Sequence, residues 1–568
     1  MKQNHAKFLA ATLLPLTIPL PAAARTVPPG ASLIQNVIII NQENRSFDNY
    51  FGTFPGANGI PPKTCVPYDP QDTQKGCVVP YYDPHDINGG GPHSPFDAQA
   101  DIDDGITHTR MDGFVQQIVN LKKRRGCKSG SPFSCLSQEQ GYARYDTVGY
   151  HTESEIPTYW TYAKKFVLQD QLFEGDRSWS FTSHLDLASE WAAQCTNPND
   201  AMSCTTSAQP KYSNNLSLPW VNLFQLLDLY GVTWKYYVDE GSEPDCPNGD
   251  IDCDAEPLNA GQPGIWNPVP LFATVQAGGQ NYLKQHNPTV AQFITDLQNG
   301  TLPQVSWIVP NGGESEHPPS RITDGMEYVT WLVNAVMTSR YWPNTAIFIS
   351  WDDWGGFYDH KAPPNVDYNN SSTPVQGFGL RVPGLMLSPY ANGGTIDKSL
   401  LSLDSYATFI EDLFTGSARL NPEQLNNPDN RPDIRDSLTS VTFLDGKTQP
   451  VGNLMDEFNF NQTPIPPLVL SVAIPQKLTP DCGATIANNF LCANTTVTLT
   501  WLRPEYYPKT GMLTYHVTRD GNELTQCTGT TRKCTDTPGS GNHLYRIYSV
   551  DSEGIKSPTS GAVEADEP

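Results

Sequence analysis

Two adjacent carboxylates, Asp352 and Asp353, stand just after the apolar run Thr345–Ile349, and Asp359 and His360 follow them closely. A short β-branched run of this kind predicts a buried parallel strand. Open α/β sheets bind their ligands beyond the carboxyl ends of such strands, and a Gly-Gly pair in this segment lets the backbone turn sharply. The alternative is a solvated polar turn, but two Trp, a Phe, a Tyr and a His in the same segment favour a metal or phosphoryl site.

A second polar group follows another predicted core strand, Asn36–Ile40. Glu43 and Asn44 place a charged and a neutral oxygen side by side, which suits a hard divalent cation or a phosphate oxygen. Taken alone, the pair is more typical of an Asx turn beside a surface acid.

Hydroxyl groups gather before a helix predicted over Leu185–Ala193. Ser180 lies among them, with Ser178 and Thr182 as close competitors and His184 just beyond. A hydroxyl at a helix N-terminus commonly acts as an N-cap, and the same position binds phosphate. The two interpretations are compatible.

The long segment from Thr53 to Asp112 is predicted to be loop-like and contains His85, His93 and His108. Isolated loop histidines are more often surface residues than ligands, so these three remain alternatives for one place at the site.

Strands and helices alternate up to about residue 415, with polar groups at the strand ends, which predicts a doubly wound α/β sheet with helices on both faces. Further predicted strands are Val232–Val238 and Gln304–Val309, and further predicted helices are Val221–Tyr230, Asp324–Arg340 and Ser405–Phe414. A short aromatic helix that leads into a strand is predicted from Pro157 onward.

The chain changes character near residue 458. A Pro-rich linker is predicted over 459–467, and alternating strands after it predict a fibronectin type III-like β-sandwich over 468–568. The preceding domain is predicted to cover 25–458.

Residues 1–24 have the three parts of a secretory signal: basic Lys2 and Lys7, the apolar stretch Phe8–Leu20 and the small residues Ala22–Ala24. We therefore expect an exported protein. The twelve Cys agree with export, because they form six close sequential pairs that predict nearest-neighbour disulfides. These pairs are Cys65/Cys77, Cys127/Cys135, Cys195/Cys204, Cys246/Cys253, Cys482/Cys492 and Cys527/Cys534.

The chain has 568 residues and a formal net charge of −24. The charge argues against binding nucleic acid or anionic lipid through bulk electrostatics. Beyond the signal, no stretch reaches the ~18 apolar residues of a membrane helix, so at most peripheral membrane contact is expected.

Three separated motifs, Asn41–Gly52, Glu316–Pro319 and Trp351–His360, together resemble the bacterial phosphoesterase family. Gly377–Pro383 and Ser388-Pro389 match as well, and the resemblance covers roughly residues 32–415. The family comprises phospholipases C of the non-haemolytic type and related acid phosphatases. Its fold is similar to that of alkaline phosphatases.

The resemblance implies a metal-assisted hydroxyl nucleophile, which would be Ser180. It implies metal ligation by Glu43, Asn44, Asp352 and Asp353, with Ser180 beside the metal, and substrate contacts from Asn44 and His184. His93, His317 and His360 would bind or protonate the phosphate. The oxygen-rich ligand set favours Ca²⁺, Mg²⁺ or Mn²⁺ slightly over Zn²⁺.

Hydrolysis would proceed through a phosphoseryl intermediate. A phospholipase C acting on phosphatidylcholine-type lipid is the first expectation, because the acidic surface suits a zwitterionic headgroup. A phosphatase of small phosphomonoesters is the alternative, and an inactive secreted binding protein is the alternative outside enzymes.

Overall fold

The computed structural model describes residues 27–102, 110–125, 146–206, 211–245, 255–364, 378–431, 440–442, 448–483, 492 and 494–567. The predicted signal, His108 and four of the cysteines (Cys127, Cys135, Cys246 and Cys253) lie outside these residues.

A central sheet of eight strands forms the core of the chain, in the order β15-β6-β14-β13-β1-β12-β9, with β16 beside β6. β1 pairs in parallel with β12 and β13, as their continuous apolar runs predict. The strands are β1 (Asn36–Gln42), β6 (Val167–Phe173), β9 (Trp234–Val238), β12 (Val305–Val309), β13 (Thr345–Trp351), β14 (Arg381–Leu387), β15 (Thr395–Asp397) and β16 (Leu401–Ser402).

The sheet is mixed rather than wholly parallel. β14 runs antiparallel to both of its neighbours, β13 and β6. A parallel return needs a crossover connection, usually a helix, and the described residues between β13 and β14 contain none. The chain therefore comes back along β13 in the opposite direction.

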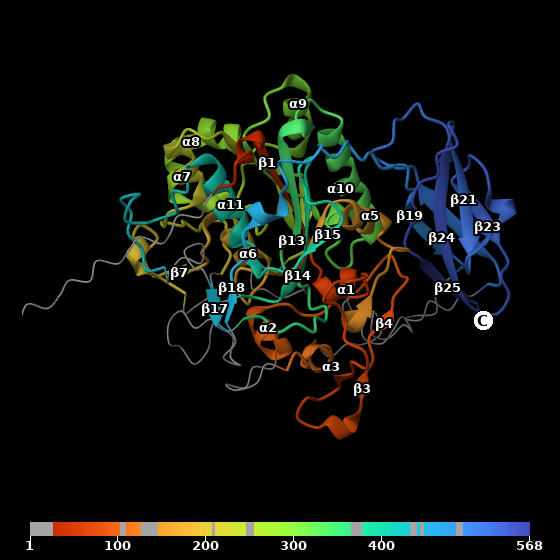
Figure 1. Ribbon diagram of the computed structural model, residues 1–568. Coiled ribbons are helices and arrows are strands. Elements are labelled where there is room, and N and C mark those ends of the chain that lie inside the picture. Colours follow the sequence, from red (N-terminus) through yellow and green to blue (C-terminus); the bar gives the residue numbers. More distant parts are fainter. Residues whose placement is uncertain are drawn as a thin grey trace, which may run out of the picture.

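Helices cover both faces of this sheet, as predicted. In Figure 1, α5 and α10 lie on one side of the central strands and α6, α7 and α11 on the other. On α10, Val329, Leu332 and Val333 have the spacing of an apolar helix face, and all three are buried. The helices are α1 (Phe47–Phe51), α2 (Pro95–Ile102), α3 (Phe114–Arg125), α5 (Pro157–Lys165), α6 (Ser180–Ser189), α7 (Leu223–Leu229), α8 (Ala273–His286), α9 (Val290–Asn299), α10 (Ile322–Met337) and α11 (Asp404–Phe414).

Two predicted elements differ from the structure. The helix expected over Leu185–Ala193 begins at Ser180 and ends at Ser189, where Glu190 takes a left-handed conformation. The segment 53–112, expected to be loop-like, contains α2. This helix begins at Pro95, a residue well suited to the first turn of a helix, and it belongs to a small core with Trp354 and Tyr358.

Short strand pairs outside the sheet fasten loops. They are β2 (Val66–Pro67) with β3 (Cys77–Val78), β4 (Tyr81–Tyr82) with β5 (Gly149–Tyr150), β7 (Gln194–Cys195) with β8 (Cys204–Thr205), β10 (Gly241–Glu243) with β11 (Glu256–Leu258), and β17 (Ser440–Thr442) with β18 (Thr448–Pro450).

The C-terminal part consists of two antiparallel sheets around a hydrophobic core of their own (blue in Figure 1). The predicted strands here are confirmed, whereas the fibronectin type III identity and the domain boundaries stay predictions. The first sheet contains β19 (Gln476–Asp481), β20 (Val497–Leu502) and β23 (Lys533–Asp536), and the second contains β21 (Leu513–Arg519), β22 (Asn522–Glu523), β24 (Gly541–Asp551) and β25 (Val563–Glu567).

The C-terminal sheets contact the rest of the chain through specific polar and aromatic groups. Tyr506 stacks on Trp331 of α10 with ring centroids 4.5 Å apart. Arg546 forms an ion pair with Glu155 at 2.6 Å. Asn334 of α10 binds the backbone of Leu470, in the extended segment that leads to β19.

Four predicted disulfides are confirmed: Cys65–Cys77, Cys195–Cys204, Cys482–Cys492 and Cys527–Cys534. The other two pairs lie outside the described residues. Among the helices that the structure describes, none has the length and apolar character needed to cross a bilayer.

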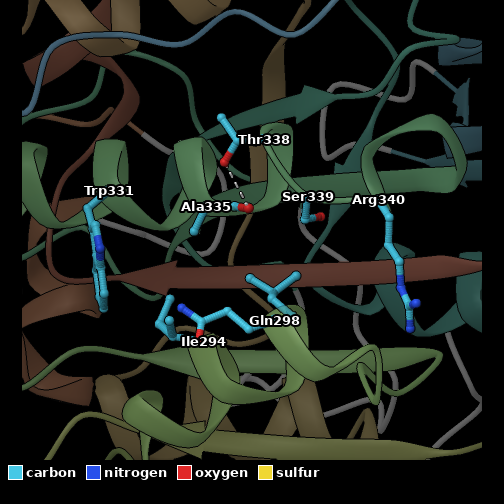
Figure 2. A pocket seen from close by; sticks show the side chains of 8 residues that line it. Ile294, Gln298, Trp331, Ala335, Thr338, Ser339 and Arg340 are labelled. Atoms are coloured by element: carbon cyan, nitrogen blue, oxygen red, sulfur yellow. Dashed lines mark hydrogen bonds between the residues drawn. The ribbon is translucent and has the colours of Figure 1, made fainter.

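A surface hollow of about 480 Å³ lies between α9 and α10. Figure 2 shows its lining, in which Arg340, in the turn between α10 and β13, is the charged group. It lies away from the strand ends that carry the acids, and it is lined by Ile294, Leu297, Gln298, Trp331, Ala335, Thr338, Ser339 and Arg340.

Candidate active site

The carboxyl ends of β1 and β13 lie side by side because the two strands pair in parallel. Their register joins Gln42 to Trp351, and the N–H of Asp352 donates to the carbonyl oxygen of Gln42 at 2.9 Å. The polar residues that follow each strand therefore start from the same point on the sheet edge. These residues, all fully buried, are Glu43, Asn44, Asp352 and Asp353.

Ser180 is the first residue of α6, and its hydroxyl lies between two of these carboxylates. Its Oγ is 3.1 Å from Asp353 Oδ2 and 3.2 Å from Glu43 Oε2. The competing hydroxyl of Thr182 lies 3.0 Å from Asp176 Oδ1 instead. A hydroxyl held between two carboxylates at a helix N-terminus is well placed for nucleophilic attack on a phosphate.

His184 lies one turn further along α6, and its Nε2 is 2.9 Å from Glu43 Oε1. Its Nδ1 is 2.9 Å from the hydroxyl of Tyr236, which donates to the carbonyl oxygen of Trp266. Nδ1 therefore carries the donating proton, and burial lowers the pKa of His184 to about 3. A neutral imidazole then directs the Nε2 lone pair at a carboxylate oxygen, an arrangement that a shared cation stabilises.

We call the residues gathered here the primary cluster: Glu43, Asn44, Ser180, His184, Asp352 and Asp353. Both amide atoms of Asn44 and both carboxylate oxygens of Asp352 are buried without a hydrogen-bond partner of normal geometry. Each such group costs about 1–3 kcal/mol. Burial, with repulsion from Asp352, raises the pKa of Glu43, and burial, with repulsion from Asp353, raises that of Asp352.

These observations fit a divalent cation. Oxygens and an imidazole nitrogen from Glu43, Asp352 and His184 lie within 4.8 Å of one another, and a cation among them would satisfy the unpartnered oxygens and offset the repulsion. The donor set, oxygen-rich with one nitrogen, accepts Ca²⁺, Mg²⁺, Mn²⁺ or Zn²⁺.

The Gly-Gly pair after Asp353 is required by close packing. Gly355 and Gly356 have φ of 59° and 70°, in the left-handed region. Gly91 donates its N–H to the carbonyl oxygen of Gly355 at 2.9 Å, and a Cβ on Gly356 would lie 2.4 Å from the Cα of Gly91. This contact brings the loop that contains His93 against the loop that contains the acids.

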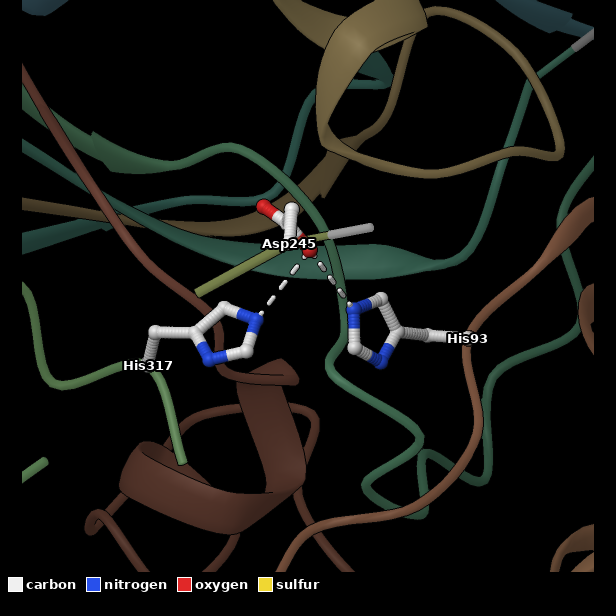
Figure 3. Close-up of side chains that lie close together, drawn as sticks. All are labelled: His93, Asp245 and His317. Carbon is white, nitrogen blue, oxygen red and sulfur yellow. Dashed lines mark hydrogen bonds and ion pairs between the residues drawn. The ribbon is translucent and has the colours of Figure 1, made fainter. Parts of the chain in front are cut away.

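A second group of buried side chains, the histidine cluster, consists of His93, Asp245 and His317 (Figure 3). The Nε2 atoms of His93 and His317 lie 3.4 Å and 3.3 Å from the same oxygen, Oδ1 of Asp245. Burial lowers the pKa of His93, but Asp353 and Asp245 outweigh burial and raise it to about 10. Gly91, two residues before His93, donates to Gly355, two residues after Asp353, so the loops that carry the two clusters are in contact.

Asp245 was not among the predicted site residues. It follows the short strand β10 in a loop, and it contacts residues that are distant in sequence. Glu174, at the carboxyl end of β6, was also missed. It is buried, accepts a hydrogen bond from the N–H of Trp354 at 3.0 Å, and has its pKa raised by burial and by Asp353. Its position at a strand end was the signal that would have identified it.

His360, predicted to reach the phosphate, lies in a separate network. Its Nδ1 is 2.7 Å from Asp48 Oδ2, and the buried Arg381 binds both Asp48 and Asp359 at 3.0 Å. We call these four residues the arginine network. The contacts of His360 therefore tie the loop after β13 to α1, and its role at the phosphate stays a prediction.

His85 also lies apart from the two clusters. Its Nδ1 is 2.6 Å from Asp83 and its Nε2 is 3.2 Å from Glu564 of β25. This histidine therefore joins the C-terminal sheets to the rest of the chain. Of His85 and His93, the two candidates that lie within the described residues, His93 is the one whose loop contacts the loop of the acids.

Comparisons with known proteins agree with the motifs. The Phosphoesterase family model matches residues 34–415, well over half of the chain. The non-hemolytic phospholipase C of Pseudomonas aeruginosa is 25% identical over 435 residues, which cover 67% of this chain and 54% of that protein. Phospholipase C A of Mycobacterium tuberculosis is 26% identical over 396 residues, which cover 63% of this chain and 69% of that protein.

The chain thus spans about half the length of the Pseudomonas aeruginosa protein. A solved protein of the alkaline phosphatase superfamily from Vibrio parahaemolyticus is 13% identical and covers 56% of this chain and 76% of its own, with a TM-score of 0.26. That TM-score is too low to support a conclusion about the fold. The family match extends over the strands and loops that carry both clusters, and the chain belongs to the Phosphoesterase family.

Proposed function

We propose that the chain is an exported, metal-dependent phosphoric ester hydrolase with Ser180 as its nucleophile, and that it acts as a phospholipase C on phosphatidylcholine-type lipids. The observation that carries the proposal is the position of the Ser180 hydroxyl, 3.1 Å and 3.2 Å from the carboxylates of Asp353 and Glu43. Unpartnered ligand atoms on Asn44 and Asp352 support the requirement for a metal.

The reaction follows from these contacts. Ser180 Oγ attacks phosphorus and passes its proton to the carboxylate of Asp353 or Glu43. The bond from phosphorus to the leaving oxygen breaks, the leaving oxygen takes a proton from solvent, and a phosphoseryl ester forms, which water then hydrolyses. A divalent cation bound by Glu43, Asn44, Asp352 and Asp353 would lower the pKa of the serine hydroxyl and draw charge from the phosphoryl oxygens.

Positive charge is also needed on the far side of the phosphate. His93 would carry it, because Asp353 and Asp245 raise its pKa, and His317 lies 3.3 Å from the same oxygen of Asp245 that His93 contacts. Asn44 would then orient the phosphate from the side of the primary cluster, and His184, whose ring nitrogens face Tyr236 and Glu43, would help to hold the cation.

The phospholipid substrate is supported by three further observations. The relatives above are named phospholipases C. Phe96, on α2, the helix that begins two residues after His93, has 85% of its surface exposed, and an exposed aromatic side chain suits contact with a lipid interface. The net charge of −24 favours a zwitterionic headgroup over an anionic one.

The test compares two substrates, phosphatidylcholine vesicles and soluble p-nitrophenyl phosphate, with product identification. We expect diacylglycerol and phosphocholine from the vesicles. Phe96→Ala should reduce turnover on vesicles about tenfold and leave turnover of a soluble phosphocholine ester unchanged. Release of inorganic phosphate from p-nitrophenyl phosphate, with no action on vesicles, would establish the phosphatase alternative instead. No turnover of any ester in the presence of divalent metals would favour a binding protein.

We infer further that the C-terminal unit over 468–568 contributes no catalytic residue, since both clusters come from residues before it. A chain that ends at Pro467 should keep turnover on a soluble phosphate ester. Circular dichroism shows whether the shortened chain is folded, and an inactive but folded chain would contradict the inference.

A further inference from the structure

We propose that Glu314, Asp324 and Glu327 form a binding site for a hard divalent cation, best suited to Ca²⁺, where α10 meets the C-terminal sheets. We call these three acids the interface cluster. Asp324 and Glu327 lie three residues apart on α10, so their side chains share a face of the helix. Glu314 is the last residue of the short 3-10 helix Gly312–Glu314, which packs against α10.

The face of α10 that carries Glu327 also holds the C-terminal part of the chain. Trp331, four residues after Glu327, stacks on Tyr506. Asn334, three residues further along the helix, exchanges hydrogen bonds of 2.7 Å and 3.0 Å with the backbone of Leu470. Glu327 faces Gln476, the first residue of β19, and this strand contacts α10. A cation bound here would therefore lie between the two parts of the chain.

The carboxylate of Glu327 has no partner in the protein. Its side chain is fully buried, and neither of its oxygens makes a hydrogen bond of normal geometry. Oδ1 of Asp324 and Oε2 of Glu314 are also buried without one. Buried polar groups in this condition are costly, so we expect something outside the chain to satisfy them.

The basic side chains nearby do not neutralise these acids. Arg321 pairs with Asp86 at 3.0 Å, and Lys477, which faces Glu314 and Asp324, is exposed. Among the ion pairs of the described residues, none includes a member of the interface cluster. The other groups that face the cluster add negative charge or hydroxyl groups: Asp239, Glu505, Tyr328 and Tyr506.

Protonation alone does not satisfy the cluster. Burial, followed by repulsion from Asp324 and Glu314, raises the pKa of Glu327, and burial, followed by repulsion from Asp324, raises that of Glu314 to about 9. The carboxyl groups therefore face one another. A neutral carboxyl must still donate its O–H to an acceptor, and Glu327 makes no such bond of normal geometry. A cation binds several oxygens at once and removes the repulsion among them.

The donors select a hard cation. Three carboxylates, with no nitrogen or sulfur in the set, favour Ca²⁺ or Mg²⁺ over Zn²⁺. Ca²⁺ takes about six to eight oxygens in a flexible arrangement, whereas Mg²⁺ demands a near-ideal octahedron. Gln476 offers a further oxygen, because its Nε2 lacks a hydrogen bond of normal geometry and a half-turn of the amide exchanges nitrogen for oxygen. Ligands that come from a helix, a turn and a separate sheet suit the more tolerant ion.

The number of Ca²⁺ ions bound per chain, measured by equilibrium dialysis of the full chain, tests the proposal. We expect Glu327→Gln to bind one Ca²⁺ fewer than wild type. Glu423→Gln, at an exposed acid outside the interface, is the matched control and should bind the wild-type number. Gln476→Glu adds a carboxylate and should tighten binding at this site at least about tenfold. Affinity should rise with pH, because Ca²⁺ must displace protons from the cluster.

Terbium luminescence distinguishes this site from the primary cluster. Tb³⁺ replaces Ca²⁺ among oxygen ligands and luminesces when a nearby aromatic ring is excited, and the rings of Tyr328 and Tyr506 face the interface cluster. Glu327→Gln should remove this signal, and Asp353→Asn, in the primary cluster, should keep it.

A Glu327→Gln chain that binds as many Ca²⁺ ions as wild type, with no gain of affinity in Gln476→Glu, would overturn the site. If Glu327→Gln does not fold, as judged by circular dichroism, Gln476→Glu decides, because it adds a ligand instead of removing one. The Ca²⁺ count does not depend on hydrolysis of any ester, so the site stands even if the proposed function fails.

Discussion

Two groups of buried acids follow the same pair of strands, and they differ in what neutralises them. In the arginine network, Arg381 Nη2 lies 3.0 Å from Asp48 Oδ1 and 3.0 Å from Asp359 Oδ2. Its Nη1 donates to the carbonyl oxygens of Asn58 and Asp170. The protein itself supplies the cation for this group.

The primary cluster has no such partner. Among the ion pairs of the described residues, no Lys or Arg pairs with Glu43, Asp352 or Asp353, and both oxygens of Asp352 lack a hydrogen bond. Uncompensated buried carboxylates are costly, so they are retained where something outside the chain neutralises them. The comparison teaches which buried acids bind a ligand: they are the ones that no Lys or Arg of the fold neutralises.

The largest expected effect is a loss of turnover without a loss of stability. Ser180→Ala should reduce turnover at least roughly 10³-fold, about 4 kcal/mol of barrier, because the covalent path is lost, and it should leave the thermal midpoint nearly unchanged. Thr182→Ala, the neighbouring hydroxyl that bonds to Asp176, is the matched control and should keep turnover. An active Ser180→Ala with an inactive Thr182→Ala would move the nucleophile two residues along the chain.

Arg381→Met should lower the stability of the protein and leave its metal content unchanged. Removing the guanidinium leaves two buried carboxylates without a cation, which costs about 3–5 kcal/mol of folding free energy. Urea denaturation measures the loss, and metal content of the folded protein should stay at the wild-type value. Arg381→Lys keeps the charge but not the forked donors, so it should be intermediate. Loss of metal without loss of stability would break the distinction between the two groups.

Of these two groups, metal removal should act on the primary cluster alone. A ligand present at 1,000 times its Kd stabilises the folded state by about 4.1 kcal/mol, so chelation should lower the free energy of unfolding by up to about this amount. Glu43→Gln should reduce the response to chelator, whereas Asp359→Asn, in the arginine network, should keep it. If both variants lost their response to chelator, both groups would take part in metal binding. If both kept it in full, Glu43 would not be a ligand.

Much of the primary cluster was predictable from sequence. The apolar runs that form β1 and β13 are continuous, so the positions of Glu43 and Asp353 beyond them follow from the general property of parallel sheets. The hydroxyl-rich start of α6 has low helix propensity, which is why the helix was expected to begin later than Ser180. The start of α2 had a recognisable sequence signal, a Ser followed three residues later by an acidic residue, Asp97. In the structure each of the two side chains accepts a hydrogen bond from the backbone N–H of the other, as in a capping box.

Other positions depend on tertiary packing and could not be predicted. His360 adjoins Asp359 in sequence, but Asp48 and Arg381 fix the direction of its ring. Asp245 meets His93 and His317 only because three distant loops converge there. The antiparallel direction of β14 depends on a connection whose described residues contain no crossover helix.

The smallest expected effect concerns a third pair of acids, which a titratable cation neutralises. Burial lowers the pKa of His85, but hydrogen bonds to Asp83 and Glu564 outweigh burial and raise it to about 9. Since the folded value lies above the unfolded one of about 6.5, the contact contributes fully below pH 6.5 and is lost as the pH rises through 9. The contribution is at most about 3 kcal/mol.

We compare the thermal midpoints of wild type and His85→Gln from pH 6 to pH 10. The difference between them reports the stability contributed by the His85 contacts, because pH effects common to both proteins cancel. We expect it to shrink toward zero at the alkaline end. His516→Gln is the matched control, because His516 pairs with the partly exposed Glu523 within the C-terminal sheets and should show a smaller difference. A His85→Gln difference that persisted unchanged above pH 9 would mean that packing rather than charge holds β25 against Asp83.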